Sequence, residues 1–223
     1  MLSDIVSVIC RVTLLALGWK TYPPGHLDYY FPDRRVVVLF SHSSYWDFVI
    51  FLLYRLAHPE LSDVYAVMKP QPFRYFGRIL RWMGFVPASP LEKRGGGFVH
   101  STIETFATVP RFRLLISPKG TIASAPWRTG YYYLAKGLDA QIQVAGLDYH
   151  RRGIAILPPR DPGRLPEIEP LLKKDMEVIH PLYPSQELHP EKVEETSLVS
   201  PYTLLAGIYI MSYAGATLLS QIL

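Results

Sequence analysis

Short β-branched runs alternate with stretches of helix length through the middle of this 223-residue chain. Neighbouring parallel strands need a crossover connection, which is usually a helix, so the alternation predicts an α/β fold with a mostly parallel central sheet flanked by helices. After residue 158 the chain is rich in proline and acidic residues, which predicts loop with one short helix near residues 171–179. We expect strands at residues 36–41, 64–68, 114–117, 142–147 and 154–157, and helices at 46–58, 73–83, 98–108 and 128–138.

Both ends of the chain are apolar. Residues 198–223 contain no Asp, Glu, Lys, Arg or His and reach the roughly 20 residues that a membrane-spanning helix needs. Residues 2–19 are interrupted by Asp4 and Arg11, which fits an interfacial anchor better than a span. A C-terminal helix docked on the folded domain is the alternative to membrane contact. We expect an N-terminal apolar anchor at residues 1–22, an α/β domain at 23–197 and a membrane-associated or transmembrane helix at 198–223.

Basic side chains are concentrated in the middle of the chain. Residues 69–136 carry eleven basic and two acidic side chains, a net charge of +9, whereas the whole chain carries +4. A basic block in a globular chain indicates an anionic partner, which is a phosphate-bearing small molecule, an anionic membrane surface or a nucleic acid. The sequence contains no recognised nucleic-acid-binding motif, so nucleic acid is the least favoured of the three.

One segment of this basic block, residues 73–85 (FRYFGRILRWMGF), has an amphipathic pattern. At 100° per residue the arginines and the apolar side chains occupy different faces of a helix: Arg74, Arg78 and Arg81 on one, Phe76, Leu80 and Met83 on the other. A basic amphipathic helix with aromatic residues binds anionic membrane surfaces. A surface helix that packs its apolar stripe on the sheet has the same pattern, and both interpretations stay open.

The loop after the first expected strand carries a histidine and a carboxylate. If Ser44 caps the following helix, Asp47 falls on the first turn of that helix, close to the ring of His42. A carboxylate in this position fixes the tautomer of an imidazole, which then acts as a general base. The spacing of Ser44 and Asp47 also matches a capping box, so a purely structural role is the alternative.

The loop after the strand at 114–117 has phosphate-binding chemistry. Gly120 allows close approach of the backbone to a phosphate, and Lys119 and Thr121 add hydrogen-bond donors. Arg128, seven residues after Thr121, has a guanidinium that can donate two parallel hydrogen bonds to a phosphate. An ordinary turn would look similar. The G-x-x-x-x-G-K-[ST] pattern is absent, which disfavours nucleotide hydrolysis. The carboxyl ends of parallel strands share one edge of a sheet, where we expect both loops.

These two loops, about 75 residues apart, resemble the glycerolipid acyltransferases typified by 1-acylglycerol-3-phosphate (lysophosphatidic acid) acyltransferase. The family pattern has four blocks: H-x-x-x-x-D, a Gly/Arg block, a Pro-Glu-Gly-Thr-Arg-Ser block and an apolar strand containing proline. The similar segments here are His42 to Asp47, Met83 to Pro87, Ser117 to Thr121 and Ile142 to Tyr149. They occur in the family's order.

The resemblance implies acyl transfer from a thioester of coenzyme A or acyl carrier protein to a free hydroxyl of a lysophospholipid. The implied acceptor is 1-acylglycerol-3-phosphate, which gives phosphatidic acid. His42 would be the base and Asp47 its orienting partner, while helix N-terminal amides and the loop at Gly120 and Thr121 would stabilise the oxyanion. The resemblance also implies membrane lipids as partners and a membrane-associated protein whose catalytic domain faces the cytoplasm.

The sequence departs from the family pattern at the phosphate-binding blocks. Lys119 stands where the family has glutamate, Ile122 where it has arginine, and Pro90 where an arginine is expected after the second block. Phosphate binding is therefore assigned to Lys119, Gly120, Thr121, Arg94 and Arg128. The alternative is a catalytically silent lipid- or membrane-binding protein that keeps the fold.

Neither a metal nor a resident cofactor is expected. Cys10 is the only cysteine, so it forms no internal disulfide and supplies no structural zinc site. The histidines other than His42 show no metal-ligand spacing. The acyl thioester would be a co-substrate.

Overall fold

The fold is built on a six-stranded sheet. The structure is a computed structural model, and it describes residues 2–21, 35–44, 46–88, 97–121 and 125–181. The strand order is β3-β2-β4-β1-β5-β6, and every neighbouring pair is parallel except β5 with β6. This confirms the α/β class and the mostly parallel sheet. The strands are β1 (Arg35–Ser41), β2 (Val64–Met68), β3 (Phe85–Pro87), β4 (Phe112–Ile116), β5 (Gln141–Asp148) and β6 (Gly153–Ile156).

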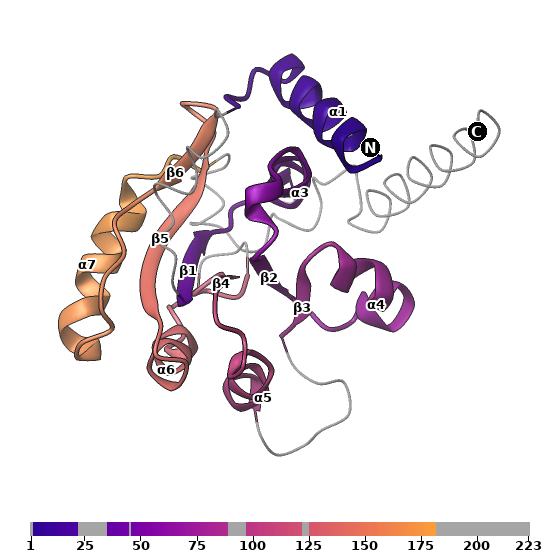
Figure 1. Cartoon of the computed structure of the whole chain (residues 1–223). Helices are drawn as coiled ribbons and strands as arrows, with labels where there is room; N and C mark the ends of the chain where they lie inside the picture. The colour runs from indigo at the N-terminus through magenta and orange to yellow at the C-terminus, as the bar shows by residue number, and fades with distance from the viewer. Residues whose placement is uncertain (1, 22–34, 45, 89–96, 122–124, 182–223) are drawn as a thin grey trace.

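Helices cover both faces of the sheet (Figure 1). α1 and α3 lie over one face, with α4 beside the edge strand β3, while α5, α6 and α7 lie over the other face. A single 3₁₀ turn, η1 (Pro59–Leu61), connects α3 to β2. The helices are α1 (Leu2–Ala16), α3 (Trp46–Ala57), α4 (Phe73–Trp82), α5 (Gly97–Phe106), α6 (Gly130–Gly137) and α7 (Leu165–Glu177).

The central strand β1 is buried on both faces. Val37 and Leu39 pack in the cluster that contains Leu134 of α6, whereas Val36 and Val38 pack in a separate cluster on the opposite face. All four side chains are fully buried. A strand covered on both faces is an almost continuous apolar run, which is why the VVVLF segment is so recognisable in the sequence.

Two parts of the expected secondary structure were wrong. The edge strand β3 was not expected, because it has only three residues and ends in Pro87, which is tolerated at a sheet edge but weakens the strand signal. The last described helix begins at Leu165 and ends at Glu177, whereas a shorter helix at 171–179 was expected. Pro166 lies in its first turn, where proline is tolerated, and Pro170 lies inside it.

The N-terminal helix α1 packs on α3 through the buried Cys10 and Leu14 and through two polar side chains. Ser7 Oγ and Arg11 Nε both donate to the carbonyl oxygen of Ala57, at 2.7 and 2.8 Å, and so satisfy the C-terminal end of α3. Its solvent-facing side is apolar, with exposed Ile5, Val8, Ile9, Val12 and Leu15.

Among the helices that the structure describes, none combines the length and the apolar character needed to cross a membrane. The expected C-terminal helix at 198–223 lies outside the described residues.

Candidate functional site

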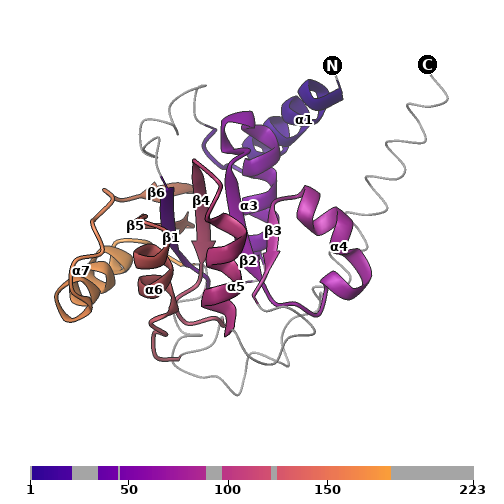
Figure 2. The same ribbon diagram turned by 60° about the horizontal axis from the view of Figure 1, so that its bottom comes forward.

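The two expected loops emerge at the middle of the sheet. β1 and β4 are adjacent and parallel, so His42 and Ser117, which directly follow them, leave from the same edge. The connection after β1 passes through α3 on one face, and the connection after β4 passes through α6 on the other (Figure 2). Ligands of open α/β sheets bind where neighbouring connections diverge in this way.

His42 and Asp47 are in contact. The Nδ1 atom of His42 lies 3.0 Å from Oδ2 of Asp47, and the carboxylate is buried while the imidazole is 32% exposed. A carboxylate oxygen only accepts hydrogen bonds, so the neutral imidazole carries its proton on Nδ1. The unprotonated Nε2 is then the nitrogen that can accept a proton from a substrate.

The same carboxylate also caps α3. Asp47 Oδ2 accepts hydrogen bonds from the backbone N–H groups of Ser43 and Ser44, at 2.7 and 2.9 Å. Ser44 Oγ in turn accepts from the backbone N–H of Trp46 at 3.0 Å. This is the reciprocal arrangement of a capping box, with aspartate in the place of the commoner glutamate. The structural and the functional interpretations of Asp47 are therefore compatible.

Tyr149 completes the hydrogen bonds of Asp47 and was not among the expected site residues. Its hydroxyl donates to Asp47 Oδ1 at 2.7 Å from just beyond the end of β5. The ring of Trp19 packs edge-on against Tyr149, with the ring centroids 5.1 Å apart. The two partners are 102 residues apart in the sequence, so no local pattern could have revealed this contact.

The expected phosphate loop is partly described. Gly120 adopts a positive φ of 69°, which glycine tolerates, and the guanidinium of Arg128 lies beside it, 3.9 Å from the position of a Cβ on Gly120. The Arg128 backbone N–H also donates to the carbonyl of Pro118 at 2.9 Å. Thr121 ends the described part of the loop, and Arg94 and Ile122 lie outside the described residues.

A pocket of about 400 Å³ joins the two loops. His42, Ser117 and Lys119 line it together with Trp127, so the structure brings the expected base and one expected cation to one cavity. α7 also lines the pocket with Lys173, whose Nζ lies 5.7 Å from the centre of the Trp127 ring and 2.6 Å from Glu169 Oε1. Lys173 lies within the helix expected at 171–179, but nothing in the sequence indicated that it would line the pocket.

The chain after α7 closes the same pocket. Ile179, which lines it, packs over Gly146 of β5, where a Cβ would lie 3.0 Å from Ile179 Cγ2 and 3.2 Å from Ser41 Cβ. Next to it, His180 Nδ1 lies 3.0 Å from Oδ2 of the buried Asp148. The backbone N–H of Arg151 donates to Asp148 Oδ1 at 2.8 Å.

The surroundings of Asp148 change its pKa. Burial by itself would raise the pKa of this carboxyl, but the hydrogen bonds from His180 and from the Arg151 backbone, together with the positive charges of both partners, outweigh it. The pKa of Asp148 therefore lies below its ordinary value, and the charged form holds the chain after α7 against the end of β5.

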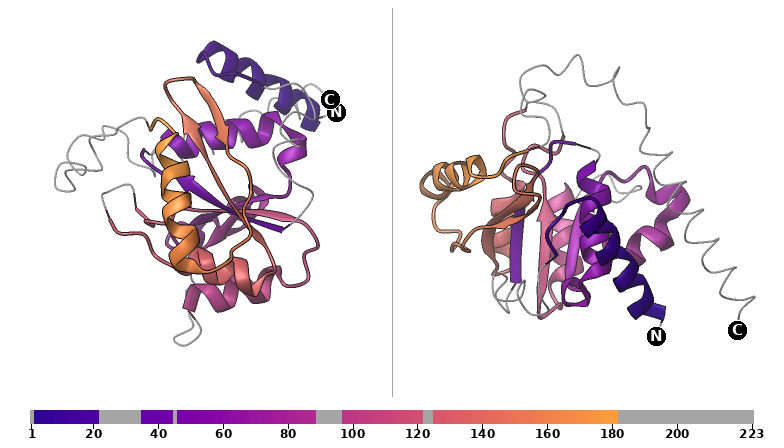
Figure 3. Two further views of the ribbon diagram at one scale, coloured as in Figure 1. Left: turned by 90° about the vertical axis from the view of Figure 1, so that its left-hand side faces the viewer. Right: turned by 90° about the horizontal axis from the view of Figure 1, so that it is seen from above.

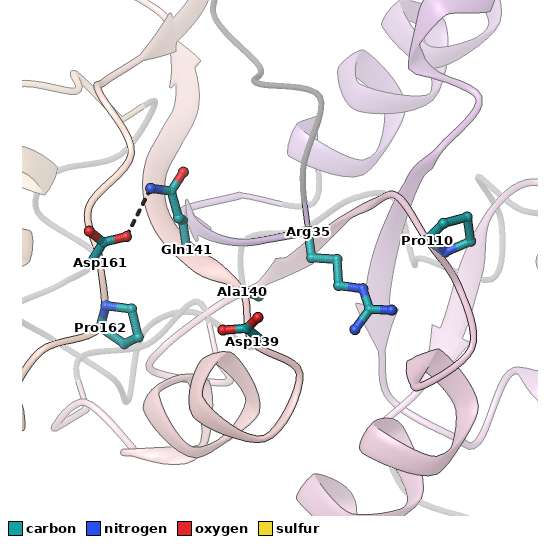
Figure 4. A pocket seen from close by; sticks show the side chains of 7 residues that line it. All are labelled: Arg35, Pro110, Asp139, Ala140, Gln141, Asp161 and Pro162. Atoms are coloured by element: carbon teal, nitrogen blue, oxygen red, sulfur yellow. Dashed lines mark hydrogen bonds between the residues drawn. The ribbon is translucent and has the colours of Figure 1, made fainter.

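Another pocket of about 400 Å³ lies at the opposite edge of the sheet (Figure 4). Its residues surround the amino ends of β1 and β5, and they include Arg35 and Gln141. The guanidinium of Arg35 already donates to the backbone carbonyls of Ala107 and Leu138, and Gln141 Nε2 donates to Asp161 at 2.9 Å. These side chains serve to join loops, so we do not assign the site there.

Within the described part of the chain, no cluster of three or more His, Cys, Asp or Glu side chains could hold a metal ion. No protein-family model matches this sequence, and no curated protein matches it either. The acyltransferase resemblance therefore depends on the four sequence blocks.

The double role of Asp47 predicts different stabilities for two variants. Asp47→Ala leaves two backbone N–H groups buried without their acceptor and removes the cap of α3, so it should lower the free energy of unfolding by about 2–4 kcal/mol. His42→Ala removes one of the hydrogen bonds to Asp47 Oδ2, which keeps its two backbone donors, and should cost less, about 1 kcal/mol. Urea denaturation measures both. Equal losses for the two variants would contradict the capping role.

The Asp148 contacts predict a pH-dependent contribution to stability. Because the pKa of Asp148 is lowered in the folded protein, its contribution is present above the unfolded value of about 3.9 and is lost as the pH falls through the folded value. Asp148→Asn should therefore be less stable than the wild type by about 1–3 kcal/mol at pH 6, with the difference narrowing below pH ~4. Urea titrations at several pH values test this, and a difference that stays constant down to pH ~2.5 would contradict it.

Proposed function

We propose that this protein is a membrane-associated O-acyltransferase. It would move a fatty acyl chain from acyl-CoA or acyl carrier protein to a free hydroxyl of a lysophospholipid, with 1-acylglycerol-3-phosphate as acceptor and phosphatidic acid as product. The observation that carries this proposal is the His42–Asp47 pair at the rim of a pocket that also contains Lys119. A base with a fixed tautomer next to a cation suits the deprotonation of a hydroxyl on an anionic lipid.

The reaction needs no covalent enzyme intermediate. Nε2 of His42 takes the proton of the acceptor hydroxyl as its oxygen attacks the thioester carbonyl carbon, and Asp47 stabilises the imidazolium that forms. The tetrahedral intermediate then expels the thiolate, which takes the proton back from Nε2 and leaves as a thiol. The only cysteine, Cys10, lies in the buried cluster between α1 and α3. Burial also raises the pKa of its thiol, which disfavours a nucleophilic role.

The developing oxyanion needs donors other than the amides at the start of α3. The sequence suggested amides at the start of the helix now labelled α3, but the N–H groups of Ser43 and Ser44 donate to Asp47, and that of Trp46 donates to Ser44 Oγ. The loop at Gly120 and Thr121 is our candidate for the oxyanion, and Lys119, which lines the same pocket as His42, is the first cation that we assign to the lipid phosphate. Arg128, beside Gly120, is the second cation that we assign to the lipid phosphate.

Membrane association is supported by the outer face of α1. From Ile5 to Leu15 the large exposed side chains of α1 are aliphatic, while Ser7 and Arg11 face the protein. An amphipathic helix oriented in this way lies in the membrane interface with its apolar face in the acyl region. We place the catalytic domain on the cytoplasmic side, where acyl-CoA and acyl carrier protein are found.

A catalytically silent lipid-binding protein is the second candidate. The observation that favours it is Lys119 at the position where the resembling family has glutamate. The contacts with lipid would be the same for the enzyme and for the silent protein. The two candidates differ only in whether His42 acts as a general base.

His42→Ala decides between these candidates. Removal of the base should reduce acyl transfer at least about 100-fold, because general base catalysis contributes typically 10²- to 10⁴-fold. The measurement is transfer of a radiolabelled acyl group from acyl-CoA to lysophosphatidic acid, with the circular dichroism spectrum as a check on folding. Activity that survives in the variant, or its absence from the wild type with every donor and lysolipid tried, would overturn the enzyme proposal.

The assigned cations predict acceptor specificity. Lys119→Ala and Arg128→Ala should each raise KM for lysophosphatidic acid about 10-fold, since a charge-assisted hydrogen bond contributes about 1.5–3 kcal/mol. Neither variant should change KM for a zwitterionic lysolipid by as much. Lys174→Ala, which removes an exposed lysine of α7, is the matched control. Transfer by the wild type to zwitterionic acceptors alone would count against the phosphate roles.

A further inference from the structure

The outer face of α4 combines exposed aromatic rings with arginines. Tyr75 and Trp82 are 80% and 74% exposed, the two highest values among the large apolar and aromatic side chains that the structure describes. Arg74 and Arg78 are exposed on the same helix, and Ile79 is 40% exposed. This outer face, made of Arg74, Tyr75, Arg78, Ile79 and Trp82, is called here the α4 surface.

The α4 surface is not needed for packing the helix. α4 packs through Phe73 and Leu80, which are buried with Phe85 of β3 and Leu52 of α3. The apolar stripe that the sequence predicted therefore packs on the sheet through the opposite side of the helix. Burial of the tyrosine and tryptophan rings requires a partner from outside the described residues.

The charge of the α4 surface is also not compensated. α4 contains three arginines and no acidic side chain. Among the described residues, Arg74 and Arg78 form no ion pair, whereas Arg81 lies along the helix with its Cζ 5.9 Å above the Phe73 ring. Two cations on an exposed aromatic surface complement a partner that is anionic and has an apolar layer beneath its charges.

An anionic lipid bilayer has this chemistry. Tryptophan and tyrosine prefer the membrane interface, where one part of the ring is apolar and the other hydrated, and arginine binds lipid phosphates. α4 also connects the carboxyl end of β2 to β3, so it begins at the edge of the sheet that carries His42 and Ser117. It lies beside β3, far from α7 (Figure 3).

We propose that the α4 surface docks the protein on anionic membranes. The arginines bind lipid phosphates, and Tyr75 and Trp82 enter the interface. This assigns lipid-charge selectivity to α4, in addition to any hydrophobic attachment through α1. Its use in presenting a lipid substrate to His42 rests on the proposed acyltransferase function, but the docking itself is measured without an acyl donor.

The test is co-sedimentation of the full chain with vesicles of phosphatidylcholine alone or with 30 mol% phosphatidylglycerol. The wild type should prefer the anionic vesicles, and 0.5 M NaCl should reduce that preference. Arg74→Gln/Arg78→Gln should lose about 5-fold in the partition coefficient per arginine, and so about 25-fold for the pair. Trp82→Phe should remove the blue shift of tryptophan fluorescence that anionic vesicles induce in the wild type.

The matched control is Arg164→Gln/Lys174→Gln, which removes two exposed basic side chains from α7 and its N-cap. Its partition coefficient should stay within about 3-fold of the wild-type value. Salt screens the attraction between the bilayer and charges that lie far from the α4 surface. Equal losses in both double variants, or wild-type binding by Arg74→Gln/Arg78→Gln, would overturn the proposal. Tighter binding of duplex DNA or RNA through the same two arginines would also overturn it, in favour of a nucleic-acid surface.

Discussion

The buried carboxylate of Asp47 is the interaction on which the site depends. It accepts four hydrogen bonds, from the His42 ring, two backbone N–H groups and the hydroxyl of Tyr149. A buried carboxylate is tolerated only when its oxygens are satisfied in this way. The same four contacts start α3, hold the loop after β1 and orient the imidazole. The same carboxylate thus caps the helix and orients the histidine. The sequence left these two roles of Asp47 as alternatives, but in the structure they occur together.

The sequence predicted those parts of the fold and site that depend on local pattern. β1 is a run of buried side chains because helices cover both of its faces, and His42 and Asp47 lie five residues apart in one loop. The contacts that were missed are between distant segments. Tyr149 reaches Asp47 from the end of β5, and Lys173 reaches the pocket from α7. Only the packing of the strands and helices brings these side chains together.

The N-terminal helix shows why the position of a charge matters more than its count. Arg11 interrupts the apolar stretch in the sequence and argues against a membrane-spanning helix there. In the folded chain its side chain turns toward α3 and donates to the last turn of that helix, as Ser7 also does. Ser7 and Arg11 therefore face the protein, and the outer face of the helix after Asp4 is aliphatic. Which apolar side chains of α1 face solvent and which pack on the protein cannot be recognised until the partner helix is known.

The helix that carries this face is joined to the site through aromatic packing. Trp19, just beyond the end of α1, is buried against Tyr54 of α3 and against Tyr149, whose hydroxyl reaches Asp47. Tyr54 in turn donates its hydroxyl to the carbonyl of Lys20. Close-packed aromatic side chains transmit displacement because little empty space separates them. α1, α3 and the carboxyl end of β5 therefore form one packed unit. A change in the position of α1 on α3 would displace the side chains that hold the carboxylate of Asp47, which orients His42.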